Sequence, residues 1–198
     1  MIRDNKYQLL VNAAITVMKE KGFEKASVSQ IVKEAGVAQG TFYLYFDSKN
    51  AVVPAIAEKI LNALFLKIKQ NFKSEETIFN TLEMIVEVTF DITKEYRELI
   101  LFCYSGLAYY HSFERWEEIY QPYYNWLEQR LHHANESGLI YTNIELASLA
   151  KMIINLIENS AETYYLTNQI DVNTENSKKH VLMFIKSALT DCQSLRKA

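Results

Sequence analysis

The sequence predicts an all-α protein of about nine helices, and three observations support this prediction. The 198 residues include only 5 Gly and 2 Pro, so few positions interrupt a helix. Apolar residues recur at steps of three and four along most of the chain, which is the spacing of one helical face. No segment shows the alternation of a strand. We expect an N-terminal helix-turn-helix domain over residues 1–49 and a second helical domain over residues 50–198.

Two short helices are predicted close to the N-terminus. The helix before them should end at Lys21-Gly22, after an apolar face of Tyr7, Leu10, Val11, Ala14, Val17 and Met18. Ser27 opens the first short helix, and Gln30 completes a capping box with it. Gly36 is placed to take the left-handed conformation that ends this helix. Short helices around a glycine-containing turn predict a helix-turn-helix motif over about residues 27–46.

The second short helix falls in GTFYLYFDSK, residues 40–49. By composition this stretch is either a buried aromatic segment without any ligand or a helix with two faces. Helical spacing places Phe42 and Phe46 on one buried face, and we assign Leu44 to the core as well. Tyr43 lies off the buried stripe, where its ring can meet a thymine methyl and its hydroxyl a base edge or phosphate. Gly40 has no side chain to keep the sugar-phosphate backbone away.

A longer helix is expected from Lys49 to Gln70, capped by Ser48 and bent by Pro54. Lys49 lies in its first turn, where a cation opposes the helix dipole unless an anion such as a DNA phosphate binds there. Further helices are expected over residues 75–93 (capped by Ser74), 94–110, 113–136 (with a kink at Pro122), from after Asn143 to about Thr167, and 174–194.

The run SVSQIVKEAGVAQGTFYLYFDSK, with KEKGFEKAS before it, resembles the DNA-binding signature of the tetracycline-repressor (TetR) family of bacterial regulators. The resemblance covers about residues 6–60. Two departures stand out: Ala38 replaces the commoner serine cap, and Gln39 replaces a residue that is often basic, which predicts a weaker helix start and a weaker salt dependence. The resemblance implies DNA contacts by Ser27, Val28, Gln39, Gly40, Thr41, Tyr43, Tyr45 and Lys49.

The same resemblance implies a repressor that acts as a homodimer. The last two helices, about residues 145–167 and 174–194, would form a four-helix bundle with a second subunit. A two-fold dimer presents two recognition helices to a pseudo-palindromic operator in double-stranded DNA. A small molecule between the middle helices would favour a geometry that no longer fits the DNA. The apolar faces of the last two helices are Leu146, Leu149, Ala150, Ile153, Ile157 and Ala161, then Val181, Leu182, Ile185, Ala188 and Leu189.

Ten aromatic residues lie within residues 102–126. They form either an aromatic core or dimer surface, or the walls of an effector pocket. Two glutamate pairs, Glu83 with Glu87 and Glu158 with Glu162, would suit a cationic ligand if they faced inward and would be solvated if they faced outward. We expect an apolar or aromatic effector of undetermined charge. The predicted pocket includes Phe102, Tyr109, Trp116, Tyr120, Tyr123, Glu87 and Glu158.

Composition and motifs disfavour several other classes of protein. Cys103 and Cys192 match no metal spacing and are too few for a disulfide framework, so we expect core or interface thiols, a reducing cytoplasm, no metal and no cofactor. Neither a signal peptide nor a membrane span is evident.

The net charge of −3 divides into +2 over residues 1–49 (seven basic, five acidic) and −5 beyond (fourteen basic, nineteen acidic). No catalytic constellation predicts an enzyme. The alternative to a DNA-binding regulator is a TetR-like protein that acts mainly through protein–protein interaction.

Overall fold

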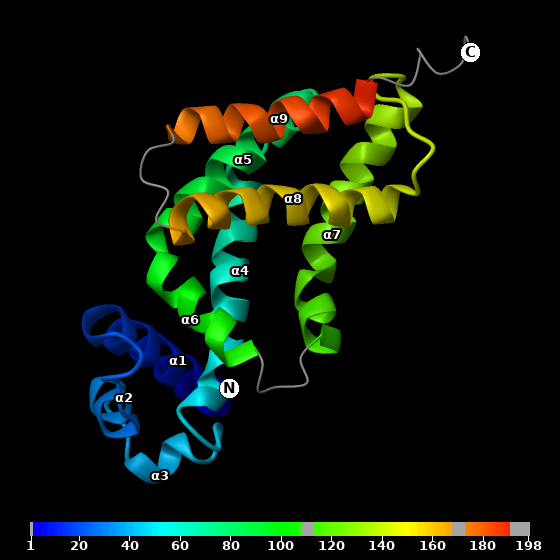
Figure 1. Cartoon of the computed structure of the whole chain (residues 1–198). Helices are drawn as coiled ribbons and strands as arrows, with labels where there is room; N and C mark the ends of the chain where they lie inside the picture. The colour runs from blue at the N-terminus through cyan, green and yellow to red at the C-terminus, as the bar shows by residue number, and fades with distance from the viewer. Residues whose placement is uncertain (1, 108–112, 168–172, 191–198) are drawn as a thin grey trace. The chain divides into compact units, whose positions relative to one another are not determined.

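The computed structural model describes residues 2–107, 113–167 and 173–190. In these ranges no residue forms a strand, and the all-α prediction is confirmed. The described residues form nine α-helices and one 3-10 helix (Figure 1): α1 (Ile2–Lys21), α2 (Val28–Glu34), α3 (Gln39–Phe42), η1 (Asn50–Val52), α4 (Val53–Asn71), α5 (Ile78–Glu95), α6 (Arg97–Leu107), α7 (Phe113–Glu136), α8 (Leu146–Leu166) and α9 (Thr174–Thr190).

The chain divides into two compact units, and each is discontinuous in sequence. The first unit joins residues 1–61 to residues 96–114, so it contains α1, α2, α3, the start of α4 and α6. Within it α1 packs against α2 and α6, and α2 packs against α3. The division at residue 49 predicted from the sequence stays a prediction. The core of this unit is apolar and includes Leu10, Ala14, Ile31, Phe42, Val52 and Ile56, all fully buried.

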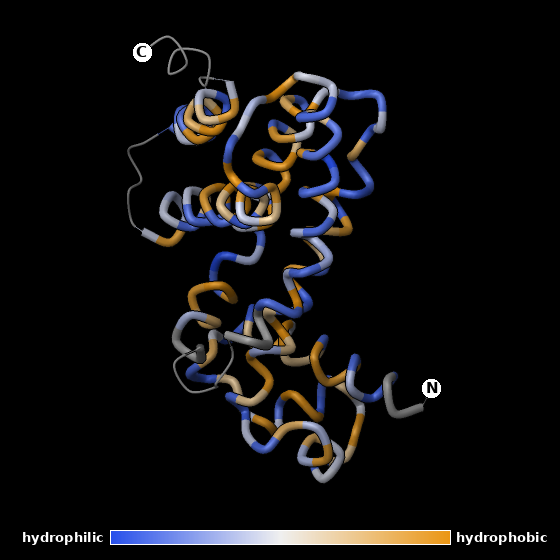
Figure 2. Tube along the Cα trace, turned by 90° about the vertical axis from the view of Figure 1, so that its right-hand side faces the viewer, coloured by the Kyte–Doolittle hydropathy of each residue, from blue (hydrophilic) through white to orange (hydrophobic). Residues whose placement is uncertain are grey.

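The second unit joins residues 62–95 to residues 115–198. Its α5 packs against both α8 and α9, and α8 packs against α9. Figure 1 shows α8 and α9 running side by side. Both helices carry hydrophobic and hydrophilic residues in alternation around their turns (Figure 2), which is the pattern of helices that bury one side.

The caps predicted for the helix-turn-helix segment are confirmed. Ser27 Oγ accepts a hydrogen bond from the Gln30 amide at 3.3 Å, and Gln30 Oε1 accepts one from the Ser27 amide at 3.0 Å. Gly36 has a φ of 65°, and Gly22 and Gly138 follow α1 and α7 with φ values of 75° and 72°. A positive φ favours glycine, so these three residues terminate their helices for the predicted reason.

Three helix starts differ from the prediction. Thr77, not Ser74, caps α5: its Oγ1 accepts a hydrogen bond from the Asn80 amide at 3.3 Å, and the helix begins at Ile78. Ser48 caps the 3-10 turn instead of an α-helix, because its Oγ accepts from the Ala51 amide at 3.3 Å. The helix expected over residues 94–110 begins at Arg97, after a turn at Tyr96.

Pro54 is the second residue of α4. The 3-10 helix η1 runs directly into α4, and the Val53 amide donates to the Asn50 carbonyl, so Pro54 lacks a donor at the junction of the two helices. The bend predicted at Pro54 stays a prediction. Pro122 lies inside α7, where a proline removes a helical hydrogen bond.

None of the helices in the described ranges combines the length and the apolar character that a bilayer crossing needs.

Candidate nucleic-acid interface and a buried carboxyl cluster

The recognition segment is a very short helix fixed by two phenylalanines. The side chain of Ala38 makes no capping hydrogen bond at the start of α3, as the predicted departure implies. After the helix ends, the amides of Tyr45 and Phe46 still donate to the Phe42 carbonyl, both at 3.0 Å. Phe42 and Phe46 are 0% and 5% exposed, and their ring centroids lie 5.4 Å apart. The prediction that this pair anchors the segment is confirmed.

Leu44 is not a core residue, and that prediction is wrong. Its side chain is 73% exposed, beside a Tyr43 that is 51% exposed. Helical geometry explains the difference: residue 44 lies about 200° around the axis from Phe42, so a segment that buries Phe42 must turn residue 44 outward. An exposed leucine and an exposed tyrosine therefore occupy one outer side of α3 and the turn after it.

The fold of the described residues does not require glycine at position 40 of α3. Its φ is not positive, and a Cβ built on it would meet no atom within 4 Å. Glycine inside a helix costs roughly 0.5–1 kcal/mol of stability relative to alanine. The absence of a side chain at this position leaves the backbone of the outer side open.

The remaining predicted DNA contacts lie around this outer side. Gln39 and Ser27 are exposed, whereas Val28 and Thr41 are half-buried. Tyr45 is also half-buried, and its ring lies 6.0 Å from that of Tyr7 on α1. Tyr45 therefore packs on its own domain through one part of the ring.

Lys49 holds the connection between α1 and α2. Its Nζ donates hydrogen bonds to the carbonyl oxygens of Phe23 and Ala26, both at 2.9 Å, and lies 4.0 Å from the centroid of the Phe23 ring. The Phe23 ring in turn stacks on Phe102 of α6, with centroids 3.7 Å apart. An ammonium group has three N–H donors, so these two bonds leave one donor of Lys49 for a phosphate.

In the second unit, α7 and α8 bring a carboxyl group together with tyrosines. The Tyr120 hydroxyl donates to Glu158 Oε2 at 2.9 Å, and the Tyr124 ring stacks on Tyr120 with centroids 5.4 Å apart. Tyr123 is 1% exposed. Glu158 as a residue is half-buried, whereas its Oε1 atom is buried and accepts no hydrogen bond from the described residues. An unsatisfied buried polar group costs about 1–3 kcal/mol of stability, so we expect a hydrogen-bonding partner at this oxygen.

Electrostatics of this cluster favour a neutral carboxyl group in the unliganded chain. Burial raises the pKa of Glu158 to about 8; the hydrogen bond from Tyr120 opposes the rise, and the charge of Glu162 adds to it. Burial is also the main reason that the pKa of Tyr123 lies well above its usual range. Thr89 of α5 carries a buried hydroxyl next to Tyr123, and its hydrogen-bonding interaction with Tyr123 opposes the rise in the pKa of that tyrosine.

Other residues of the predicted effector pocket lie elsewhere. Phe102 belongs to the first unit, where it contacts Phe23. Glu87 is about half exposed and pairs with Lys178 of α9. Tyr109 and the side chain of Trp116 lie outside the described residues. The structure therefore brings together Tyr120, Tyr123 and Glu158 from the predicted set.

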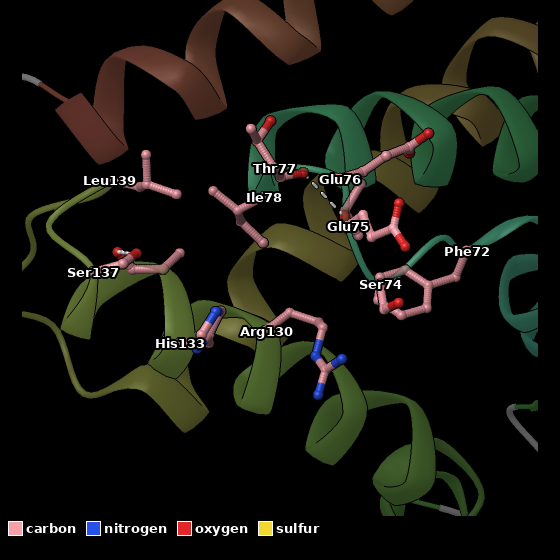
Figure 3. A pocket seen from close by; sticks show the side chains of 12 residues that line it. Phe72, Ser74, Glu75, Glu76, Thr77, Ile78, Arg130, His133, Ser137 and Leu139 are labelled. Carbon is pink, nitrogen blue, oxygen red and sulfur yellow. Dashed lines mark hydrogen bonds between the residues drawn. The ribbon is translucent and has the colours of Figure 1, made fainter.

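A pocket that the sequence did not indicate lies between the start of α5 and the end of α7 (Figure 3). Its volume is about 460 Å³. Arg130 and His133 line it from α7, and Glu75 and Glu76 line it from the turn before α5, so it presents both signs of charge. The Arg130 guanidinium lies 5.4 Å from the centroid of the Phe72 ring. The Glu158 cluster contributes no residue to it.

No group of three or more His, Cys, Asp or Glu side chains in the described ranges is arranged to hold a metal ion. Cys103 is buried, and burial raises the pKa of its thiol to about 12. Cys192 lies outside the described residues.

The apolar faces predicted to meet a second subunit are mostly used within the chain. Leu149, Ile153 and Ile157 of α8 are buried, as are Val181, Ile185 and Leu189 of α9, because both helices pack on α5 and on each other. Other large apolar side chains on these helices remain exposed. They are Met152 at 57%, Met183 at 56% and Phe184 at 66%.

Two short helices around a glycine turn, braced by α1 and exposing an aromatic outer side, define a helix-turn-helix protein. Residues 10–56 match the bacterial regulatory proteins of the tetR family, and residues 82–189 match the tetracyclin repressor-like C-terminal domain. The chain belongs to the tetR family and is a DNA-binding transcriptional regulator.

Similar proteins agree over nearly the whole length. The chain is 47% identical over 184 residues to the uncharacterized HTH-type transcriptional regulator YvdT of Bacillus subtilis, covering 93% of this chain and 95% of that protein. The crystal structure of FadR from Bacillus subtilis in complex with stearoyl-CoA has a TM-score of 0.71 at 25% identity, covering 92% and 99%. Thermus thermophilus FadR in complex with lauroyl-CoA has a TM-score of 0.72 at 18% identity, covering 92% and 94%, a likeness of fold.

Proposed function

We propose that this regulator is a repressor in the cytoplasm whose homodimer binds a pseudo-palindromic operator and is released by a small molecule with an apolar or aromatic body. The single observation that carries the proposal is the outer side of α3, where Gly40, Tyr43 and Leu44 are exposed and none is needed by the core.

The chemistry of this outer side suits the major groove. Tyr43 offers a ring face and a hydroxyl, and Leu44 offers an apolar group for a thymine methyl. The open backbone at Gly40 permits close approach. Ser27, Val28, Gln39, Thr41 and Tyr45 would add backbone-directed contacts, and the third donor of Lys49 would bind a phosphate.

Dimer formation would use the exposed side of the last two helices. Met152, Met183 and Phe184 supply apolar surface that the chain itself leaves uncovered. A two-fold contact there would place two α3 helices for successive major grooves.

The effector would bind at the Glu158 cluster. Tyr120 and Tyr123 line it with rings, and Glu158 supplies a polar anchor. The FadR structures that hold stearoyl-CoA and lauroyl-CoA support an effector with an apolar body. Release of DNA follows if the effector binds more tightly to a dimer geometry that does not fit the operator.

The direct test is a gel shift of the upstream region of the chain's own gene with Tyr43→Ala. We expect the variant to lose at least about tenfold in affinity, the equivalent of one or more base or methyl contacts. Tyr104→Ala is the matched control, because Tyr104 of α6 is 52% exposed against 51% for Tyr43. Unchanged binding by the Tyr43 variant, or equal losses in both variants, would contradict the assigned interface. Circular dichroism confirms that both variants fold.

A further inference from the structure

We propose that Glu158 anchors a protonated amine, so that the effector is an apolar or aromatic molecule carrying an ammonium group with at least one N–H. This inference rests on the proposed function, since it names the chemical class of the molecule that the Glu158 cluster would take.

Glu158 has one carboxyl oxygen without a hydrogen-bond partner in the described part of the chain. Tyr120 occupies Glu158 Oε2 at 2.9 Å, while the buried Oε1 has no donor among the described residues. Buried polar atoms in folded proteins nearly always have a partner, and an orphan indicates a missing water, ion or ligand. Once Glu158 is ionised, this oxygen can only accept, so a ligand that binds the carboxylate must bring an N–H or O–H.

The charged groups around Glu158 favour a cation. Glu162 adds negative charge from α8. The lysine of α8, Lys151, pairs with Glu117 of α7 and lies 5.2 Å from the centroid of the Tyr124 ring. Lys178 of α9 likewise pairs with Glu87 of α5 and with Glu175. None of the basic side chains described in these helices forms an ion pair with Glu158. A ligand cation would supply a countercharge that the described side chains do not supply.

A protonated amine fits this site better than a neutral donor. An alcohol brings no charge, so Glu158 would stay protonated beside it, as it is in the unliganded chain. An ammonium group supplies both the hydrogen bond and the charge. The ring of Tyr120 and the buried ring of Tyr123 add faces that attract cations. The Tyr124 ring stacks on Tyr120 and already has Lys151 Nζ 5.2 Å from its centroid.

Binding of the amine is then coupled to the release of a proton from Glu158. Because burial places the pKa of Glu158 at about 8, the carboxyl group is protonated at neutral pH. A bound ammonium favours the carboxylate, so one proton leaves Glu158 for the solvent as the cation binds, and no covalent bond changes. Among the described residues, Tyr120 of α7 and Glu162 of α8 act on the pKa of Glu158, and the charge of Glu158 in turn adds to the rise that burial causes in the pKa values of Tyr123 and Tyr124 of α7. Affinity for an amine should rise with pH, by up to tenfold per pH unit below about 8.

Calorimetry on the full chain with two probes of equal length tests the proposal. Octylammonium is the cation, and 1-octanol is the neutral molecule. We expect octylammonium to bind at least tenfold more tightly at pH 7.5. Titrations in buffers of different ionisation enthalpy should show the release of up to one proton, and Kd should fall from pH 6 to pH 7.5. The Glu158→Gln variant should lose both the preference and the proton release.

Glu83→Gln is the matched control, because Glu83 of α5 is 58% exposed and should not affect either property. Equal affinity for the two probes, or octylammonium binding that survives Glu158→Gln without change, would overturn the proposal. The proposal would also be overturned if lauroyl-CoA bound the wild type and Glu158→Gln equally and octylammonium did not compete with it. Operator binding is measured on the same preparations: if Glu158→Gln still shifts the operator, the regulator assignment stands whichever way the amine result falls.

Discussion

Lys49 has a structural role in the first unit and a proposed role in DNA binding. Its hydrogen bonds to the Phe23 and Ala26 carbonyls tie the loop before α2 to the residue before η1. We expect Lys49→Met to lower the free energy of unfolding by about 1.5–3 kcal/mol, the value of a hydrogen bond from a charged group. If the third donor binds a phosphate, the slope of log K against log[salt] should also fall by about 0.9 per subunit bound.

Denaturant unfolding and gel shifts at several salt concentrations measure the two effects of Lys49→Met separately. Lys49→Arg is the control for charge. A variant that is destabilised but keeps the wild-type salt slope would confine Lys49 to the fold and exclude it from the DNA contacts.

At Gly40, in contrast, one substitution should raise the stability of the chain and weaken its binding to DNA. Since a Cβ at this position meets no atom within 4 Å, Gly40→Ala should stabilise the chain by roughly 0.5–1 kcal/mol. The added methyl group should at the same time weaken operator binding, because it would occupy the space that we propose DNA enters. Thermal unfolding and gel shifts measure both quantities, and a variant that is more stable and binds normally would refute a close approach at Gly40.

Individual side chains were predictable where helical spacing alone decides them. Phe42 and Phe46 follow from a step of four residues, and the same geometry should have turned Leu44 outward. The state of Glu158 could not be predicted, because all four glutamates share one spacing. Which of them is covered depends on where α7 lies against α8, and that is a tertiary contact between residues 38 positions apart.

At the scale of elements, the two prolines should behave differently. Pro54 lies in the first turn of α4, so Pro54→Ala should change the free energy of unfolding by less than about 1 kcal/mol. Pro122 lies inside α7, and Pro122→Ala restores a helical hydrogen bond and should stabilise the chain by about 1–3 kcal/mol. Urea titrations compare the two; a larger effect at Pro54 would show that this proline has a role beyond its own turn.

Helix ends were predictable where two signals coincide. Ser27 with Gln30, and the glycines after α1, α2 and α7, each combine a cap with a change of pattern. The start of α5 was missed because Ser74 and Thr77 both suit a cap, and only the backbone path selects Thr77. Local propensity cannot rank two adequate caps separated by three residues.

At the scale of the whole molecule, the exposed apolar side chains of α8 and α9 predict the assembly state. If the proposed dimer uses this surface, Phe184→Asp should yield a monomer and reduce operator affinity, because a single helix-turn-helix contacts half a site. Light scattering after size exclusion measures the mass. Leu66→Asp is the control, since Leu66 of α4 is 53% exposed and lies outside these helices. A dimeric Phe184→Asp would place the interface elsewhere.

The family and the all-α class follow from the N-terminal motif and the paucity of glycine and proline. The discontinuous units do not, because nothing in the local pattern of Arg97–Leu107 indicates that α6 belongs with α1 and not with the helices on either side of it in sequence. Long-range topology of this kind is set by which apolar faces fit together, and many faces are equivalent at the level of composition.

The stack of Phe102 on Phe23 has a consequence for how the chain is made. The two rings are 79 positions apart in sequence (102 − 23), and Phe23 also lies beneath the ammonium group of Lys49. During synthesis the first 56 residues leave the ribosome without the ring that covers Phe23. The packing of the first unit around Phe23 is therefore complete only after α6 has been synthesised.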